Sequence, residues 1–178
     1  ASQGEGLDAL INNASLFVYD EITEFSAQTL QSHMAVNVAA PAILTAEFAK
    51  NIRHENQGCV INMLDSKLFG LNPDYFTYTL SKAALQNFGI LAAQAYAPRL
   101  RVNAIAPGIT LPSGGQTQAE FKKSHQRNLL RKGADTKDIV AAARLILATG
   151  SMTGETIILD GGAHLRPLPR DVAFMKDN

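Results

Sequence analysis

Four short apolar runs alternate with helical patterns in this chain, and no other feature limits the possible fold as strongly. Each run is nearly continuously apolar, and each is too short to be a helix of its own. Runs of this kind are typical of strands buried on both faces of a parallel sheet. The runs are Leu7–Asn13, Gly58–Leu64, Leu100–Ala106 and Glu155–Leu159. The alternation predicts an α/β fold, with a parallel sheet between two layers of helices.

Helical spacing fills the segments between these runs. The helical patterns lie at Ser26–Arg53, Tyr75–Ala97, Ala119–Leu130 and Thr136–Thr149. Pro41 interrupts the first pattern, and because proline has no N–H, the carbonyl of Asn37 four residues earlier loses its helical partner. We therefore expect a break in this helix. The break is either an ordinary proline kink or a site where the free Asn37 carbonyl binds water.

The composition excludes several classes of protein. Sixteen basic and sixteen acidic residues give a formal net charge of zero, without a basic stripe, so nucleic acid is not an expected partner. No apolar stretch is suited to cross a bilayer, and no secretory signal opens the chain. We therefore expect a cytoplasmic protein that does not bind membranes. The histidines His33, His54 and His125 lack paired ligands, so we expect them to face solvent and expect no metal site.

Tyr78 and Lys82 stand four residues apart near the start of a predicted helix, and therefore share one face. A phenol is a poor acid–base group at neutral pH, because its unperturbed pKa is about 10. A lysine cation ~5 Å away, at an effective dielectric constant of ~20, favours the phenolate by roughly 3 kcal/mol, or about two pK units. The pair is thus a candidate for acid–base chemistry, although this spacing alone is also typical of an exposed helix surface.

Polar or turn-forming motifs follow the first three apolar runs. They are Asn12-Asn13-Ala14-Ser15, Asp65-Ser66 and Pro107-Gly108. Taken in order with the tyrosine–lysine pair, these motifs resemble the short-chain dehydrogenase/reductase family, and the resemblance extends from Leu7 to Gly162. It implies a Rossmann-type, doubly wound parallel sheet, oxidoreductase activity with a dinucleotide cofactor, and assembly into a homotetramer.

The resemblance also implies a role for each motif. Tyr78 is the proton donor, Lys82 lowers its pKa, and Asn37 holds a water molecule in a proton relay to the lysine. NADP(H) is the implied cofactor, with NAD(H) left open. The implied cofactor-binding residues, which follow the first and third strands or belong to the catalytic pair, are Asn13, Ala14, Ser15, Tyr78, Lys82, Pro107, Gly108, Ile109 and Thr110.

Two departures from the common family pattern coincide in one branch. Asp65 stands thirteen residues before the tyrosine, where the family usually has serine, and Ser66 is one residue out of register and so faces the other way. The first motif ends in Ser15 where glycine is common, and Phe17 follows. These features resemble the pteridine reductases and dihydromonapterin reductases. The resemblance implies a pterin-like substrate at Ser15, Phe17, Asp65 and Tyr78, with Asp65 catalytic and Phe17 stacked on the pterin ring.

The family's glycine-rich phosphate loop, T-G-x-x-x-G-x-G, does not occur in the chain. We therefore expect residues 1–178 to be the C-terminal part of a single Rossmann-type domain that lacks its N-terminal strands, with an irregular tail at residues 163–178. Two alternatives stay open: a short-chain carbonyl reductase or alcohol dehydrogenase with another substrate, and an inactive fragment that keeps only the scaffold.

Overall fold

The centre of the molecule is a parallel sheet. The structure is a computed structural model that describes residues 7–52, 57–112 and 116–175. The strands lie in the order β1-β2-β3-β4. Their bounds are Ala9–Asn12 for β1, Gly58–Met63 for β2, Leu100–Pro107 for β3 and Thr156–Leu159 for β4. Each apolar run of the sequence therefore forms a strand, and all three pairings are parallel, as predicted.

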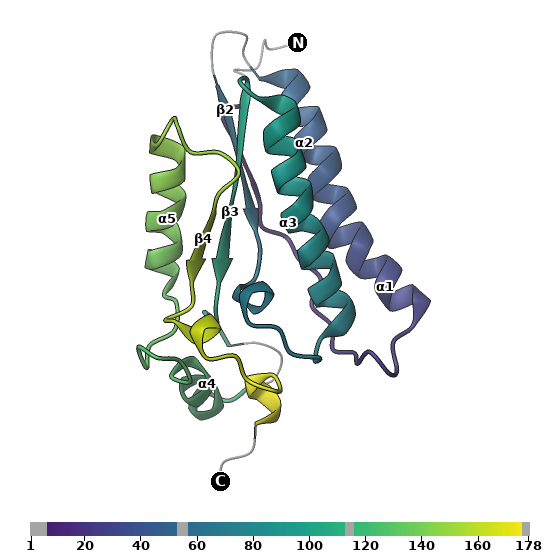
Figure 1. Ribbon diagram of the computed structural model, residues 1–178, viewed down its shortest axis with the longest axis vertical. Helices are drawn as coiled ribbons and strands as arrows, with labels where there is room; N and C mark the ends of the chain where they lie inside the picture. The colour runs from purple at the N-terminus through teal and green to yellow at the C-terminus, as the bar shows by residue number, and fades with distance from the viewer. Residues whose placement is uncertain (1–6, 53–56, 113–115, 176–178) are drawn as a thin grey trace.

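Helices cover both faces of this sheet (Figure 1). The α-helices are α1 (Ala27–Met34), α2 (Ala40–Asn51), α3 (Phe76–Tyr96), α4 (Gln118–His125) and α5 (Thr136–Ala148). α2 and α3 pack on one face and α5 packs on the other, so the predicted three-layer α/β architecture of the Rossmann type is confirmed. No helix in the described ranges is long and apolar enough to span a membrane.

Apolar side chains fill the space between the layers. Val60 and Val102 pack against α2 and α3, whereas Ile61 and Ile105 pack against Ile146 of α5. Burial of such a side chain contributes about 1.5–3 kcal/mol, so β2 and β3, which are buried along nearly their whole length, form the stable centre. β1 is an edge strand in the described part of the chain.

A π-helical turn at Ala35–Ala39 separates α1 from α2. The Ala40 N–H bonds to the Ala35 carbonyl, five residues back. Pro41 follows at the start of α2. Because proline has no N–H to donate to the carbonyl four residues earlier, the helix forms a wider turn here. The predicted break is therefore present. The π-turn buries Asn37 completely, and such turns are frequent at functional sites.

The burial of the histidines differs from what the sequence predicts. His33 is fully buried, so the expectation that it faces solvent is wrong. Its two ring nitrogens are satisfied inside the molecule, by the Val18 N–H and the Thr77 hydroxyl. His125 is partly buried, and His54 lies outside the described residues.

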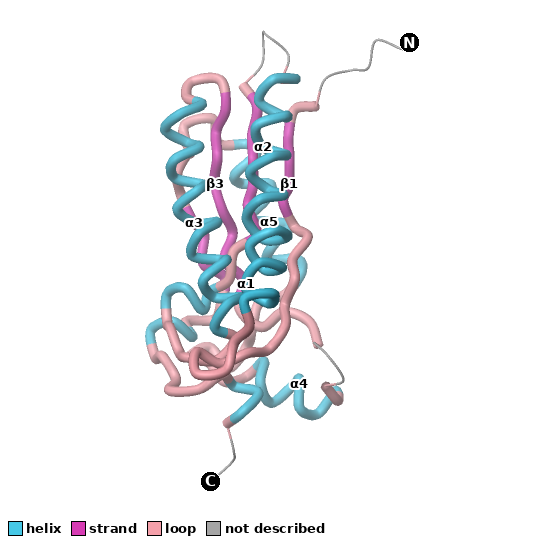
Figure 2. The backbone as a smooth tube through the Cα atoms, turned by 90° about the vertical axis from the view of Figure 1, so that its right-hand side faces the viewer, coloured by secondary structure: helices cyan, strands magenta, loops and turns pink. Residues whose placement is uncertain are grey.

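The carboxyl ends of the strands point toward one end of the molecule, where the loops, α4 and the C-terminal segment gather (Figures 1 and 2). The tail that the sequence predicts to be irregular contains two short 3-10 turns, at Ala163–Leu165 and Val172–Phe174. In open α/β sheets, ligands bind outside the carboxyl ends of the strands. This end of the molecule is therefore where a site is expected.

Candidate active site

Asp65 and Tyr78 meet just beyond the carboxyl end of β2. Asp65 caps the 3-10 turn that follows this strand, and its Oδ1 accepts the Lys67 N–H at 2.8 Å. Its other oxygen, Oδ2, accepts the hydroxyl of Tyr78, in the first turn of α3, at 2.8 Å. The prediction from strand register that Asp65 faces the tyrosine is therefore confirmed.

The charges around Tyr78 differ from the expected pattern. The Lys82 ammonium lies 5.7 Å from the centre of the Tyr78 ring and donates to the Met63 carbonyl at 2.8 Å. Burial, the charge of Asp65 and the hydrogen bond to Asp65 together raise the pKa of Tyr78 above its ordinary value. The net shift of the Tyr78 pKa is upward because the phenol is buried and donates to a carboxylate, and the role of Lys82 in lowering this pKa stays a prediction.

Burial perturbs the other two groups as well. It raises the pKa of the Asp65 carboxyl, against the hydrogen bonds from Lys67 and Tyr78. It lowers the pKa of Lys82 to about 8, although the charge of Asp65 acts in the opposite direction. Perturbed pKa values of this kind concentrate at functional sites. Asp65 and Tyr78 therefore form a hydrogen-bonded pair in which both members hold their protons more tightly than in water.

The Asn37 side chain holds the loop that follows β1. Its Oδ1 accepts the Leu16 N–H at 2.7 Å and the Ser15 hydroxyl at 3.2 Å. Its Nδ2 donates to the Leu16 carbonyl and to Ser81 Oγ, both at 2.9 Å. The sequence pointed to the backbone carbonyl of Asn37, whereas the structure shows that its side chain also connects this loop to α3.

Phe17 lies in this loop and faces two tyrosines. Its ring is stacked on Tyr75, with centres 4.3 Å apart, and meets the Tyr78 ring edge-on at 4.7 Å. Tyr75 has a φ of 54°, a left-handed conformation that is unusual for a residue with a side chain. The Phe17 side chain is still 46% exposed, so part of its ring surface is open to a ligand.

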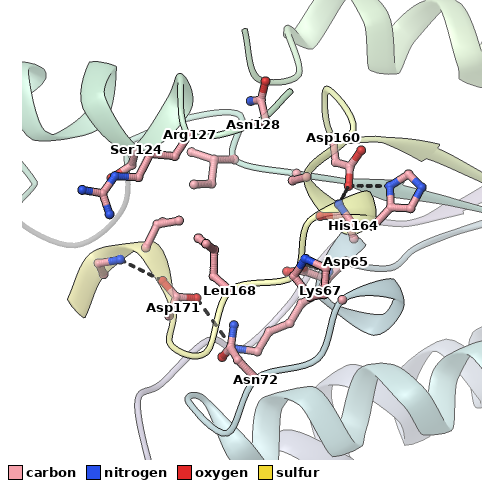
Figure 3. Close-up of a pocket in the computed structure, with 18 of the residues that line it drawn as sticks. Asp65, Lys67, Asn72, Ser124, Arg127, Asn128, Asp160, His164, Leu168 and Asp171 are labelled. Atoms are coloured by element: carbon pink, nitrogen blue, oxygen red, sulfur yellow. Dashed lines mark hydrogen bonds and ion pairs between the residues drawn. The ribbon is translucent and has the colours of Figure 1, made fainter. Parts of the chain in front are cut away.

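A cavity of about 310 Å³ lies beside this cluster. Figure 3 shows Asp65 and Lys67 across it from Ser124 and Arg127. Of the predicted site residues, Phe17, Asp65, Gly108, Ile109 and Thr110 line the cavity, and so does Ser66, the neighbour of Asp65. Tyr78 and Lys82 are buried behind this wall, and Asn13, Ala14 and Ser15 are exposed beyond the end of β1. The predicted residues therefore surround one end of the sheet, but only part of them lines the cavity.

The end of β3 could hold part of a dinucleotide. A side chain at Gly108 would bring its Cβ to 2.9 Å from Asp160, so only glycine allows this close approach. The exposed Asn13–Ser15 segment, the Thr110 hydroxyl and the Lys82 ammonium supply polar groups at the same end of the sheet. Polar groups beyond the carboxyl ends of the strands are where an open α/β sheet binds its ligand, so this set could hold part of a dinucleotide.

The C-terminal segment supplies one wall of the cavity, which was not predicted from the sequence. Arg170 binds the buried Asp74, with Nε at 2.9 Å from both carboxylate oxygens and Nη2 at 2.6 Å from one. The Asp171 N–H donates to the same carboxylate at 2.6 Å. This segment follows β4, and segments that follow strands at the carboxyl edge of such a sheet often contact the ligand. Its position in the sequence could therefore have indicated its role. The lining residues of the tail beyond His164 are Arg166, Pro167, Leu168, Arg170, Asp171, Val172 and Ala173.

Lys67 also lines the cavity and was not predicted from the sequence. Its side chain is only 9% exposed, and its Nζ lies 2.5 Å from Asn72 Oδ1 and 3.6 Å from Asp171 Oδ2. The ammonium also lies 5.4 Å from the centre of the Tyr75 ring. Lys67 therefore connects the turn that carries Asp65 to the C-terminal wall of the cavity.

Comparison with known proteins identifies the family. The family model described as enoyl-(acyl carrier protein) reductase matches residues 1–164. An uncharacterized oxidoreductase of Thermotoga maritima is 31% identical over 169 residues, which cover 88% of this chain and 67% of that protein. The chain therefore belongs to the short-chain dehydrogenase/reductase family, a family of oxidoreductases, as its motifs indicate.

Two further relatives belong to the branch that the motifs predict. Dihydromonapterin reductase of Shigella boydii is 26% identical over 163 residues, which cover 90% of this chain and 68% of that protein. The solved structure of FolM alternative dihydrofolate reductase 1 from Brucella suis, in complex with NADP, is 39% identical with a TM-score of 0.87. That match covers 90% of this chain and 65% of the solved chain, so this chain spans less than two thirds of its length. Both relatives support the resemblance to the pteridine reductases.

Proposed function

We propose that this protein is an NADPH-dependent reductase that acts on a dihydropterin, with Tyr78 as the proton donor. The observation that carries the proposal is the 2.8 Å hydrogen bond between the Tyr78 hydroxyl and Asp65. A carboxyl group beside the phenol suits a ring substrate that takes up a proton at one nitrogen and presents N–H donors at others. The NADP-bound and dihydromonapterin-reducing relatives support the choice of cofactor and substrate.

The residues of this chain donate and replace the proton that the substrate takes up. When bound, NADPH would supply the hydride for reduction of a C=N bond in the substrate. Tyr78 donates its hydroxyl proton to the nitrogen of that bond, and the nearby Lys82 ammonium stabilises the resulting phenolate. Asp65 returns a proton to Tyr78 or accepts an N–H of the substrate, and the Asn37 carbonyl holds a relay water.

The substrate is proposed to lie between Phe17 and Asp65. A volume of about 310 Å³ is at the lower end of the range for small-molecule sites and suits a compact bicyclic ring. The half-exposed Phe17 ring offers an aromatic surface on which a flat heterocycle can stack. The proposed substrate site comprises Ser15, Phe17, Asp65 and Tyr78. The proposed cofactor site comprises Asn13–Ser15, Tyr78, Lys82 and residues 107–110.

A substrate panel tests the proposal. The purified protein is given NADPH or NADH with dihydromonapterin, dihydrofolate, or a set of ketones and aldehydes, and cofactor oxidation is followed by absorbance. We expect reduction of a dihydropterin with NADPH, and loss of that activity in Tyr78→Phe. Turnover of carbonyl substrates alone would instead support a carbonyl reductase, and failure to bind either cofactor would support an inactive scaffold.

The oligomeric state belongs to the same proposal. Large apolar side chains of the neighbouring helices α2 and α3 are exposed, and exposed apolar surface often marks contacts between proteins. We propose that these helices form the contact of a homotetramer, which light scattering coupled to size-exclusion chromatography tests. The exposed side chains are Ile43, Leu44, Leu80, Ile90 and Leu91.

A further inference from the structure

His33 connects three segments inside the molecule. Its Nε2 accepts the Val18 N–H at 3.2 Å, and its Nδ1 lies 2.8 Å from Thr77 Oγ1. Because a backbone N–H can only donate, Nε2 carries no proton, and the single proton of the neutral ring is on Nδ1. That proton is donated to Thr77, whose hydroxyl is in turn donated to the Asp20 carboxylate. The Thr29 backbone also hydrogen-bonds this ring.

A second connection of the same kind lies one helical turn away. Asn37 follows His33 by four residues, and Ser81 follows Thr77 by four residues. As described above, Asn37 binds both backbone groups of Leu16 and donates to Ser81. His33 and Asn37 therefore form two parallel links from the first helical segment to α3, and each link also holds the loop after β1.

Phe17 lies between the two residues that these links hold. Leu16 is bound by Asn37, and Val18 is bound by His33. The Phe17 side chain itself is 46% exposed, so burial alone holds it weakly. The other end of each link is on α3, which carries Tyr78 directly after Thr77. The links, together with the Tyr75 ring on which Phe17 stacks, therefore set where the Phe17 ring lies relative to the Tyr78 ring, 4.7 Å away.

We propose that His33 is a positioning residue, which acts by holding Phe17 in register with Tyr78 for reduction of the substrate. The proposal rests on the proposed function, because the position of Phe17 affects turnover only if Phe17 contacts the substrate. His33 itself is fully buried and contacts neither the cavity nor the Tyr78 hydroxyl. The His33 ring also meets the Tyr78 ring edge-on, with centres 6.2 Å apart, so the test compares variants that both lack this ring and differ in the bond to Val18.

Two substitutions separate the two bonds of His33. Glutamine carries its amide about as far from the backbone as imidazole Nε2, so His33→Gln can still accept the Val18 N–H. Asparagine carries its amide about as far out as Nδ1, so His33→Asn can bond to Thr77 but leaves Val18 unbound. Both variants remove the buried ring, so each is a control for the general loss of stability in the other.

Amide hydrogen exchange, measured by NMR, reports on the link directly. We expect the Val18 amide to be protected in the wild type and in His33→Gln, and to exchange at least about tenfold faster in His33→Asn. The Leu16 amide is the internal control, because Asn37 holds it and it should stay protected in all three proteins. Equal exchange at Val18 in the wild type and His33→Asn would overturn the proposal.

Kinetics then test the consequence of the link. For dihydromonapterin, kcat/KM should fall about tenfold in His33→Asn and recover in His33→Gln, with unchanged affinity for NADPH. Faster exchange at Val18 without loss of kcat/KM would overturn the role in catalysis. Absence of pterin reduction in the wild type would refute the proposed function, and the exchange data would still decide whether His33 holds the loop.

Discussion

The Tyr78 hydroxyl donates to the Asp65 carboxylate over 2.8 Å, and the pKa values of both groups are raised. A carboxylate beside a phenol makes the phenol a weaker acid, which is the opposite of what a nearby lysine does. Protonation of Asp65 removes that negative charge and so makes Tyr78 a better donor. The pair is therefore expected to act as a unit, in which the charge of Asp65 controls when Tyr78 releases its proton.

Asp65→Asn should lower the pKa of Tyr78. The substitution removes the negative charge that raises this pKa and keeps the size of the side chain. The phenolate absorbance of the protein is titrated for the wild type and the variant, and Tyr78→Phe identifies the part of the signal that Tyr78 contributes. An unchanged titration of Tyr78 in Asp65→Asn would contradict the coupling.

Tyr78→Phe should keep the fold and lose the reaction. Among the residues that the structure describes, the Tyr78 hydroxyl bonds only to Asp65, and its ring packs against Phe17, so phenylalanine preserves the packing. Removal of a positioned proton donor costs about 10²–10⁴-fold in rate. We expect kcat to fall by that factor with little change in thermal unfolding. Activity within a few-fold of the wild type would assign the proton to another group.

The free energy of unfolding should decrease on acidification over the pH range in which His33 titrates. Burial lowers the pKa of His33, against the charge of Asp20 and a hydrogen bond with the Thr29 backbone. Below about pH 6.5 the unfolded chain protonates this histidine whereas the folded protein does not. The free energy of unfolding should therefore decrease as the pH falls from about 6.5 to the lowered folded-state pKa, and this contribution should then be constant.

Urea unfolding at a series of pH values measures this dependence. His33→Gln removes the titrating group, so the variant should lose this part of the slope while other groups keep theirs. The Tyr78 ring, which lies 6.2 Å from the His33 ring, stays protonated throughout the window and adds no slope. The same slope in both proteins would show that His33 is not the group responsible.

Arg170→Gln should loosen the C-terminal wall of the cavity. Arg170 holds Asp74 with two nitrogens, and it lowers the pKa of that carboxyl. Without the guanidinium, the Asp74 pKa should rise, the tail should become sensitive to proteolysis, and KM for the substrate should increase more than kcat decreases. Arg166→Gln, a change at another exposed tail arginine that lines the cavity, is the control. Equal protease sensitivity of the two variants would contradict a specific role for the Arg170–Asp74 pair.

Three features were predictable from local rules. Periodicity predicts the strands, proline geometry predicts the break near Pro41, and strand register predicts that the Asp65 side chain faces Tyr78. The Rossmann-type sheet follows from the same local patterns. Residues 1–178 as the C-terminal part of one domain, a cytoplasmic location and the absence of a metal stay predictions.

The remaining features depend on contacts between distant segments, which no local pattern contains. His33 and Thr77 are 44 residues apart, and Arg170 and Asp74 are 96 residues apart. The upward shift of the Tyr78 pKa was not predictable, because the four-residue spacing places Lys82 on the correct face but does not show that Tyr78 is buried beside Asp65. A histidine with no metal partner in sequence was likewise assigned to the surface, although the fold supplies partners for both of its nitrogens.

The most direct test of the central claim is kcat/KM for NADPH-dependent reduction of dihydromonapterin, measured side by side for the wild type and Asp65→Ser. The variant restores the residue that is common in the family and removes the carboxyl group beside Tyr78. If Asp65 and Tyr78 act as a pair on a pterin, kcat/KM should fall at least about tenfold while the affinity for NADPH is unchanged. Equal values for the two proteins would contradict the account.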